Sequence, residues 1–428
     1  MAHTPTTTTT LADILKDDLA PSIVQATAEK SFLLSILEQK VGKVAYGGKA
    51  FIIPLQFNNM GSTISVTDSD TLADAMPGSY EQASVPIYGS SFSLALTALS
   101  MAVSDADKYA WAEAMAADVM VKTRAFRQQQ NRKLNSQGTG ILAQAAANAS
   151  TVYVTVDNAH GLSGFNDSVV NGDRFVTPNM KVDFYTGASI RDTPGGATIT
   201  AITRGSFPST AAILEFTAAA DINEVVDGDY MYVAGSKGNE YPGLGLLIDD
   251  GTIGTTFQSV VIANNPEFAS HVHYGSTSGT AEAITDKRIM NLIDDVEAEG
   301  GTVDWALTSN AVWLTIMDMM KAQTQLVSIN TNKTPLDTSF PGIEYAGFDI
   351  FKDPYSIDHL YLVDNRAIKI REVQPQGWME YDGSVLHQVS QTTVYAAYWM
   401  WFMTPAIENR KWTGKMQDIT VGFDKNLK

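Results

Sequence analysis

Two histidines that stand two residues apart could share a metal ion. His271 and His273 flank a valine, and alternate residues of a strand point to the same face. A zinc site needs at least three protein ligands, and no third ligand accompanies the pair. The remaining histidines are scattered along the chain: His3, His160, His359 and His387. We therefore expect no metal site.

Two pairs of carboxylates invite a calcium or acid–base interpretation. Asp249 and Asp250 precede Gly251, and Asp294 and Asp295 stand together in a helical pattern. Neither pair has the regular spacing of oxygen ligands found in an EF-hand loop. We expect them to be solvated carboxylates of a turn and a helix.

Glycine-rich segments and nucleophiles give no support for catalysis. Gly47–Lys49 lacks the upstream glycine and the following Ser or Thr of a phosphate-binding loop, and Gly243–Gly245 lacks the third glycine of a dinucleotide fingerprint. No Gly-x-Ser-x-Gly elbow occurs, and the chain has no cysteine. We expect no catalytic residues, no cofactor and no enzymatic activity.

The charge of the chain disfavours tight binding to nucleic acid. Its formal net charge is −18 over 428 residues, so the free subunit repels phosphate. A basic cluster near one helix end could contact DNA phosphates or form salt bridges between subunits, and both remain open: Arg124, Arg127, Arg132 and Lys133. The aromatic residues of 395–402 are expected in a core rather than as a base-stacking platform.

No segment indicates a membrane or an export route. No window approaches about 18 consecutive apolar residues, and Met1–Thr10 is a polar threonine run unlike a signal or transit peptide. We expect a protein made and kept in the cytoplasm.

The first hundred residues predict two helices followed by a long hairpin. Apolar periodicity favours helices over 11–19 and 26–38. Residues 51–55 read as the outgoing strand, and 84–88 with 92–96 read as the return, around a tip at 58–78. An isolated two-stranded ribbon is marginal in water. We expect this hairpin to need a surface supplied by another subunit.

A long helix and a β-rich region come next. The helix is predicted over 104–134, with Ser104 as its N-cap and Gly138 and Gly140 after its end. Residues 150–236 read as short strands of a small antiparallel barrel or sandwich, with type I′ turns at Asn171-Gly172 and Asp227-Gly228. We expect this region to be an insertion that folds independently.

The remaining chain alternates helices and strands. Helices are predicted over 285–300 and 310–321, and strands over 305–309, 348–351 and 360–363. Residues 392–402 could form a strand or a buried helix.

The order of these elements resembles the major capsid proteins of tailed double-stranded DNA phages, the Hong Kong 97-like family. Short motifs of the second half follow that family's succession, and no single one is specific: Tyr241–Leu244, Asn265–Phe268, Gly300-Gly301 before Trp305–Ser309, Gly347–Ile350 before Asp353-Pro354, and Trp378 with Asp382-Gly383. The resemblance covers nearly the whole chain except 150–236.

The resemblance implies an α+β Hong Kong 97-like capsid fold with an inserted small all-β domain. Its parts would be an N-terminal arm (1–40), an extended β-hairpin loop (41–100), a spine helix with peripheral domain (101–149), the insertion (150–236), a return to the peripheral and axial body (237–284), an axial domain (285–405) and a C-terminal segment (406–428). The insertion would project from the outer face of the shell. Some relatives crosslink through a lysine of the hairpin, but 58–78 has no lysine and Lys49 lies near its base.

As implied by the resemblance, the chain assembles into hexamers and pentamers of an icosahedral head shell around packaged DNA. Partners would be further copies, portal and scaffolding proteins, a decoration protein, and DNA through non-specific contact, with no membrane. The protein would reside in the virion after assembly in the host cytoplasm. Residues expected at contacts between subunits are Phe51, Ile53, Leu55, Val85, Ile87, Tyr88, Arg124 and Arg127. The alternatives are an encapsulin-type compartment shell and a β-rich glycan-binding or adhesive protein.

Overall fold

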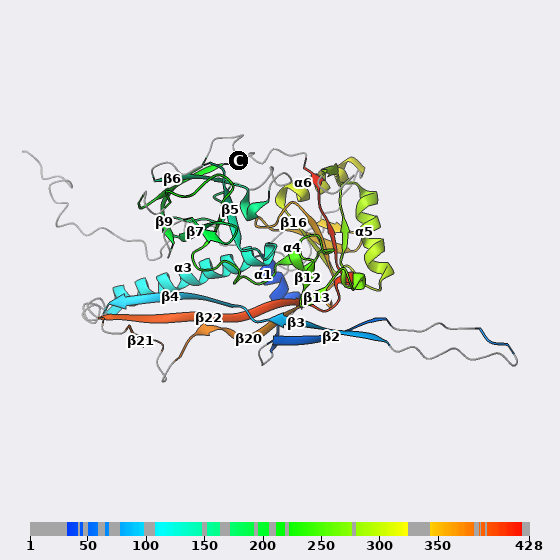
Figure 1. Ribbon diagram of the computed structural model, residues 1–428, viewed down its shortest axis with the longest axis horizontal. Coiled ribbons are helices and arrows are strands. Elements are labelled where there is room, and N and C mark those ends of the chain that lie inside the picture. The colour runs from blue at the N-terminus through cyan, green and yellow to red at the C-terminus, as the bar shows by residue number, and fades with distance from the viewer. Residues whose placement is uncertain are drawn as a thin grey trace, which may run out of the picture. The chain divides into compact units, whose positions relative to one another are not determined.

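The structure is a computed structural model of the chain (Figure 1). It describes residues 32–41, 43–45, 50–58, 65–67, 78–97, 108–147, 152–162, 172–191, 196–204, 211–218, 222–275, 280–323, 343–380, 385, 387–389 and 392–421. The expected helix over 11–19 and most of the hairpin tip lie outside these residues. Within them, no helix is long and apolar enough to cross a membrane.

Contacts divide the chain into two compact units. The smaller contains Phe92–Phe126 and Met379–Tyr398, and the larger contains Ser31–Ser91, Arg127–Trp378 and Trp399–Lys428. In the smaller unit the rings of Phe92 and Phe126 lie 5.5 Å apart. In the same unit β21 (His387–Gln388) pairs with the start of β22 (Val394–Ile407).

The larger unit contains a mixed six-stranded sheet, which we call the central sheet. Its strand order is β14-β23-β19-β16-β18-β17, and β16 runs parallel to β18 but antiparallel to β19. The strands are β14 (His271–His273), β16 (Trp305–Thr308), β17 (Ile343–Tyr345), β18 (Phe348–Lys352), β19 (Leu360–Val363) and β23 (Gly414–Met416). The predicted strands over 305–309, 348–351 and 360–363 are confirmed.

Two helices pack on this sheet, and both were predicted as helices from the sequence. They are α5 (Asp286–Ala298) and α6 (Asn310–Gln323). In α5 the Thr285 side chain accepts a hydrogen bond from the backbone N–H of Arg288, which satisfies one of the donors left free in a first turn. Its four buried residues recur at helical spacing: Ile289, Leu292, Ile293 and Val296. The first three of them join the core under the sheet.

A closed antiparallel barrel follows the long helix. Its order is β11-β5-β6-β10-β9-β7, and β11 also pairs with β7, so the ring of strands closes. The strands are β5 (Ile141–Ala145), β6 (Tyr153–Asp157), β7 (Lys181–Thr186), β9 (Ala197–Arg204), β10 (Ala212–Phe216) and β11 (Tyr230–Val233), with β8 (Ser189–Ile190) beside β7 and η2 (Ala159–Gly161) after β6. The barrel begins before residue 150, because β5 is one of its strands.

The turns of the barrel differ from the sequence prediction. A type I′ turn needs positive φ at both central residues, but of Asp227 and Gly228 only Gly228 has positive φ (90°). The reason is that β11 does not form a hairpin with the preceding strand, and pairs instead with β5 and β7. Residues 174–176, which follow the expected Asn171-Gly172 turn, form no strand.

The ambiguous segment 392–402 forms a strand, β22. It lies in a five-stranded sheet of order β1-β20-β22-β21, with β4 also paired to β22. The other strands are β1 (Lys43–Ala45), β4 (Gly89–Thr97) and β20 (Ile368–Trp378). The expected assignment of 92–96 to the hairpin is therefore wrong. The aromatic run is only partly core, since Trp401 is buried and Tyr398 is exposed.

The hairpin and the long helix have the predicted identities, and Ser104, the expected N-cap of the helix, lies outside the described residues. The hairpin is β2 (Ala50–Asn58) paired with β3 (Ser79–Pro86), and the long helix is α3 (Lys108–Asn135). The helix predicted over 26–38 is described as α1 (Phe32–Ile36) continuing into a π-helical turn, η1 (Leu37–Val41). Shorter elements complete the fold: α4 (Leu244–Leu247), β12 (Thr256–Phe257), β13 (Val260–Val261), η4 (Pro266–Phe268), β15 (Glu282–Ala283), η5 (Arg410–Trp412) and β24 (Ile419–Thr420).

Candidate intersubunit surface

The two faces of the β2–β3 hairpin differ in burial. Residues 51, 53, 55 and 57 of β2 point to one face and 52, 54 and 56 to the other, as strand geometry requires. On the first face Ile53 and Leu55 are each 8% exposed, whereas Ile52 on the second is 54% exposed. Across the ladder Ile52 lies opposite Ser84, and Gln56 lies opposite Tyr80, which is 69% exposed. We call the face of Ile52, Pro54, Gln56, Tyr80, Gln82 and Ser84 the outer face.

The inner face of the hairpin is covered by its own chain. The Ser84 N–H donates to the carbonyl of Gln258 at 2.7 Å. The Asn265 amide donates to Glu81 at 2.7 Å, and the Phe57 and Phe268 rings lie 6.0 Å apart. Residues 258–268 therefore cover part of the hairpin, and among the described hairpin residues the outer face is left for a partner.

The covering segment contains a strained turn. Gln258 and Ser259 join β12 to β13 with φ of 49° and 68°, the two positive values that a type I′ turn requires. Neither residue is glycine or asparagine, which adopt this conformation most readily. The hydrogen bond from Ser84 to the Gln258 carbonyl attaches this turn to the hairpin.

The base of the hairpin is also fixed to the β20–β22 sheet. The Thr404 hydroxyl accepts from the Tyr88 N–H at 3.2 Å and donates to the Pro86 carbonyl at 2.9 Å. The Arg371 guanidinium lies 3.9 Å from the centre of the Phe51 ring, a cation–π distance. These contacts fix the direction in which the hairpin leaves the body.

The residues expected at contacts between subunits differ in how deeply they are buried. Ile53, Leu55 and Val85 are buried inside the chain, so little of them remains for a partner. Phe51, Ile87 and Tyr88 are half-buried at the hairpin base. The sequence interpretation missed Ile52 and Tyr80. Strand alternation separates these two residues from Ile53 and Leu55, but it does not tell which face the chain covers.

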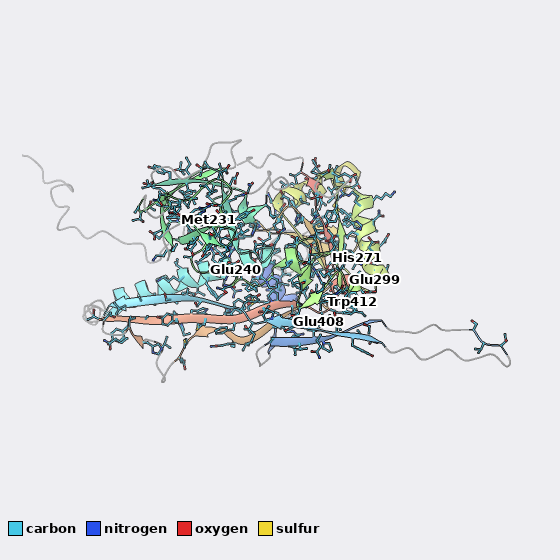
Figure 2. The ribbon with its side chains drawn as sticks, in the orientation of Figure 1. Met231, Glu240, His271, Glu299, Glu408 and Trp412 are labelled. Carbon is cyan, nitrogen blue, oxygen red and sulfur yellow. The ribbon has the colours of Figure 1, made fainter. Side chains whose placement is uncertain are left out.

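The basic cluster of α3 makes contacts within the chain. Arg127 pairs with Glu38 at 2.8 Å. Arg132 forms an ion pair with Glu240, which follows the barrel in sequence and is labelled in Figure 2, and both side chains are 1% exposed. Lys133 donates to the Ser90 hydroxyl at 3.0 Å, and Arg124 is half-buried. Neither DNA contact nor a salt bridge between subunits is needed to explain Arg127, Arg132 or Lys133.

Of the two histidines considered for metal binding, His273 has another partner. His273 Nε2 lies 2.6 Å from Asp295 Oδ2. No group of three or more His, Cys, Asp or Glu side chains that could hold a metal ion occurs among the described residues. Gly243, considered above as part of a nucleotide loop, packs on the end of α3, where an added Cβ would lie 2.4 Å from the carbonyl oxygens of Lys133 and Ser136.

Asp249 is not the solvated turn carboxylate that the sequence suggested. It is 1% exposed, and its Oδ1 lies 3.3 Å from Nζ of Lys415, whose side chain is fully buried. Its Oδ2 accepts from the backbone N–H groups of Gly251, Ile253 and Gly254 at 3.0, 3.0 and 3.3 Å. Burial lowers the pKa of Lys415, and Asp249 acts in the opposite direction. The pair joins the segment after α4 to β23 of the central sheet.

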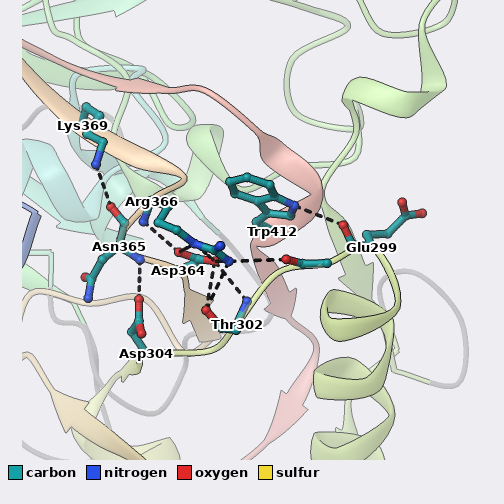
Figure 3. Close-up of polar contacts among 9 residues, drawn as sticks. Glu299, Thr302, Asp304, Asp364, Asn365, Arg366, Lys369 and Trp412 are labelled. Atoms are coloured by element: carbon teal, nitrogen blue, oxygen red, sulfur yellow. Dashed lines mark hydrogen bonds and ion pairs between the residues drawn. The ribbon is translucent and has the colours of Figure 1, made fainter. Parts of the chain in front are cut away.

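A second buried carboxylate, Asp364, connects loops at one end of the central sheet (Figure 3). It accepts from the Thr302 N–H at 3.0 Å and from Arg366 Nη2 at 2.6 Å. Burial acts to raise the pKa of Asp364, but the hydrogen bonds from Arg366 and Thr302 outweigh it and hold that pKa below its usual value. The Arg366 guanidinium lies over the Trp412 ring, and the Trp412 indole donates to the Glu299 carbonyl at 3.1 Å. This network orders the loop after α5 against the β19–β20 turn and η5.

Two histidines are buried in neutral form. Burial lowers the pKa of His160 and that of His359 to about 3, with Arg132 adding to the effect at His160 and Lys415 at His359. As the pH falls, a histidine whose pKa is lowered by folding is protonated in the unfolded chain at a higher pH than in the folded chain. Its stabilising contribution is therefore complete above about pH 6.5 and is lost as the pH falls from 6.5 towards 3.

We predict that the free energy of unfolding falls on going from pH 7.5 to pH 5, by about 2 kcal/mol for each of these histidines. His359→Gln and His160→Asn should each reduce this difference, because neither new side chain titrates. Asn also tolerates the positive φ of 60° at residue 160. Urea unfolding at the two pH values measures the effect, with His387→Gln as the control at a half-buried histidine. An unchanged difference in both buried-site variants would contradict the prediction.

Comparison with known proteins gives a match of fold. No family profile matches the sequence, and no curated protein does. A chain of the cyanophage A-1(L) capsid asymmetric unit aligns over 97% of this chain and 100% of its own, with 12% identity and a TM-score of 0.60. The capsid of the native GTA particle covers 95% and 96% with 9% identity and a TM-score of 0.48. The SrpI encapsulin of Synechococcus elongatus PCC 7942 covers 100% of both chains with 6% identity and a TM-score of 0.47. The α+β capsid fold expected from the sequence is confirmed.

Proposed function

We propose that the chain is a major capsid protein that assembles into the head shell of a tailed phage around packaged double-stranded DNA. The observation that carries this proposal is the fold shared with the cyanophage A-1(L) capsid chain over nearly the full length of both. The hairpin gives it a physical basis. Its inner face is bound to its own chain, while Ile52 and Tyr80 on the outer face are apolar and exposed. A second copy of the chain is the partner that a closed shell would place there.

The mechanism of such a subunit is repeated association without a catalytic step. Each copy makes several modest contacts in hexamers and pentamers, and closure of the shell makes many of them simultaneous. The protein would then reside in the virion after assembly in the host cytoplasm. Portal, scaffolding and decoration proteins are proposed as further partners.

Electron microscopy of the purified protein tests the proposal. We expect rings or closed particles in negative stain, at protein concentrations in the micromolar range or above. A protein that stays strictly monomeric, alone and with a scaffolding protein, would contradict it. Glycan binding by such a monomer would instead favour an adhesive protein.

We further propose that the barrel is an insertion in the capsid fold, with limits near residues 141 and 233. Its first and last strands are neighbours, since Ile141 pairs with Tyr232, and paired residues of antiparallel strands lie about 5 Å apart. The barrel has its own core of buried residues from β5 to β11. A module with adjacent ends and its own core can be removed without breaking the path of the remaining chain.

Deletion of residues 142–231, with Ile141 and Tyr232 joined by two glycines, is expected to leave a body that folds and assembles. The body keeps the Arg132–Glu240 ion pair and loses the contact of Tyr355 with the barrel core. Thermal unfolding and negative-stain microscopy measure the outcome against the full chain. A deleted chain without a cooperative transition would mean that the barrel is part of the core of the body.

A further inference from the structure

One buried turn, Asp353–Ser356, contacts several separate parts of the larger unit. The turn follows β18, and its first residue is bound to the central sheet, because the Asp353 N–H donates to the carbonyl of Thr308 at 3.0 Å. The Asp353 side chain is 0% exposed. A carboxylate buried this deeply needs several hydrogen bonds.

The Asp353 carboxylate receives four hydrogen bonds from three segments. Its Oδ2 accepts from the Leu33 N–H of α1 at 3.1 Å, and from the Asn131 and Asn135 amides of α3 at 2.9 and 3.2 Å. Its Oδ1 accepts from the Tyr355 N–H of its own turn at 2.8 Å. All four donors are neutral, and all four bonds depend on one acceptor group, whose pKa is raised by burial.

Asn131 extends the network to a second residue of α1. Its Oδ1 accepts from the Leu34 N–H at 3.1 Å, while its amide nitrogen donates to Asp353. The N–H groups of Leu33 and Leu34 belong to the first turn of α1, where a helix has no internal acceptor for them. Leu33 and Leu34 are 0% exposed, and the Phe32 and Phe351 rings lie 5.5 Å apart. The start of α1 is therefore satisfied only while α3 and the turn keep their positions.

The same turn reaches the barrel through Tyr355. Its ring stacks on Phe175 with centroids 5.7 Å apart and an angle of 22°, and Tyr355 packs against the barrel core. The Phe175 ring in turn lies 4.4 Å from that of His160. Two residues of one turn, Asp353 and Tyr355, thus contact α1 and α3 on one side and the barrel on the other.

We propose that the Asp353–Ser356 turn is a conformational joint that makes the positions of α1 and the end of α3 depend on each other, and on which the packing of the adjacent barrel residues depends in turn. Asp353 Oδ2 accepts from both α1 and α3, so displacement of α1, α3 or the turn leaves buried donors without this partner. Such a group opposes partial movement. The start of α1, the end of α3 and the turn therefore keep their positions together or release together. The joint is a property of the single chain and does not depend on the proposed assembly.

Hydrogen exchange measured by mass spectrometry on the full-length Asp353→Asn variant tests the joint. The side-chain oxygen of the new asparagine can accept from Leu33, Asn131 and Asn135 only if its NH2 group faces the Tyr355 N–H, which places two donors against each other. In the reverse orientation the NH2 group faces the three donors of Leu33, Asn131 and Asn135. We expect exchange at least about tenfold faster in residues 32–41, in residues 130–135 of α3 and in residues 172–176 of the barrel. Faster exchange confined to 353–356 would overturn the proposal.

Two further variants separate a joint from a general loss of stability. Asn135→Ala removes one donor from Oδ2 and is expected to raise exchange in the same segments by a smaller factor, so it remains informative if Asp353→Asn fails to fold. Tyr355→Ala keeps all four bonds to the carboxylate and should raise exchange only at 172–176. Asp294→Asn makes the same chemical change as Asp353→Asn at an exposed position of α5 and should change none of these segments. Equal effects of Asp353→Asn and Tyr355→Ala on 32–41 would also overturn the proposal.

Discussion

Asp249→Ala is expected to lower the free energy of unfolding by about 3–5 kcal/mol. The substitution removes the counter-ion of Lys415, whose side chain is fully buried. It also leaves three backbone N–H groups without their acceptor, at Gly251, Ile253 and Gly254. An uncompensated buried charge and unsatisfied buried donors are among the most destabilising consequences of a single substitution.

Variants of both partners separate the contributions to this effect. Lys415→Met should cost less than Asp249→Ala, because the Asp249 carboxylate keeps its three N–H donors. The double variant should cost less than the sum of the two single ones, since the second substitution removes the charge that the first left unpaired. Urea unfolding of unassembled protein measures all three, with Asp294→Ala at an exposed position as the control, expected within about 0.5 kcal/mol of the parent. A cost for Asp249→Ala below about 1 kcal/mol would contradict the prediction.

Local sequence patterns predict the helices and strands whose buried residues recur at short, regular spacing. Ile289, Leu292, Ile293 and Val296 are the buried stripe of α5 in the sequence and in the structure. The strand 360–363 was predicted because its apolar residues stand in one continuous run, and all four are buried. In both cases the information that defines the element lies within a few residues.

Local sequence patterns do not show which distant strands pair with each other. The sequence of 392–402 fits a strand or a buried helix, because threonines and alternation around Val394 stand at the start of a dense apolar block. The structure resolves this segment through pairing of β22 with β20 and β4. Residues 92–96 were assigned to the hairpin as the nearest strand in sequence, although β4 pairs with β22 instead. Register between distant strands depends on the tertiary fold and leaves little local trace.

The candidate intersubunit surface could be predicted only in part, because it too depends on contacts between distant segments. Alternation in β2 divides Ile52 from Ile53, but whether Ile53 meets a partner or its own chain depends on residues 258–268. The burial of Asp249 likewise depends on Lys415, which is 166 residues away. A pair of adjacent aspartates carries no local signal that distinguishes a solvated turn from a buried ion pair.

The double substitution Ile52→Asp with Tyr80→Asp is expected to abolish assembly while leaving the fold intact. Both side chains are exposed on the outer face, at 54% and 69%, so the isolated chain loses little by the change. In a shell in which this face lies on a second copy, each new carboxylate would be buried without a partner, at a cost of several kcal/mol per contact. That cost recurs in every subunit, so closed particles should disappear at concentrations at which the parent forms them.

Two matched variants make this prediction specific to the outer face. Ile53→Asp, one residue away on the buried inner face, should destabilise the monomer itself, which urea unfolding detects. Ile213→Asp makes the same kind of change at a residue of the barrel that is 42% exposed and should leave both folding and particle yield unchanged. Size-exclusion chromatography and negative-stain microscopy compare the yields. Particles of normal yield from the double variant would show that the outer face does not meet another subunit, because two buried carboxylates per subunit cannot be accommodated without a large loss of affinity.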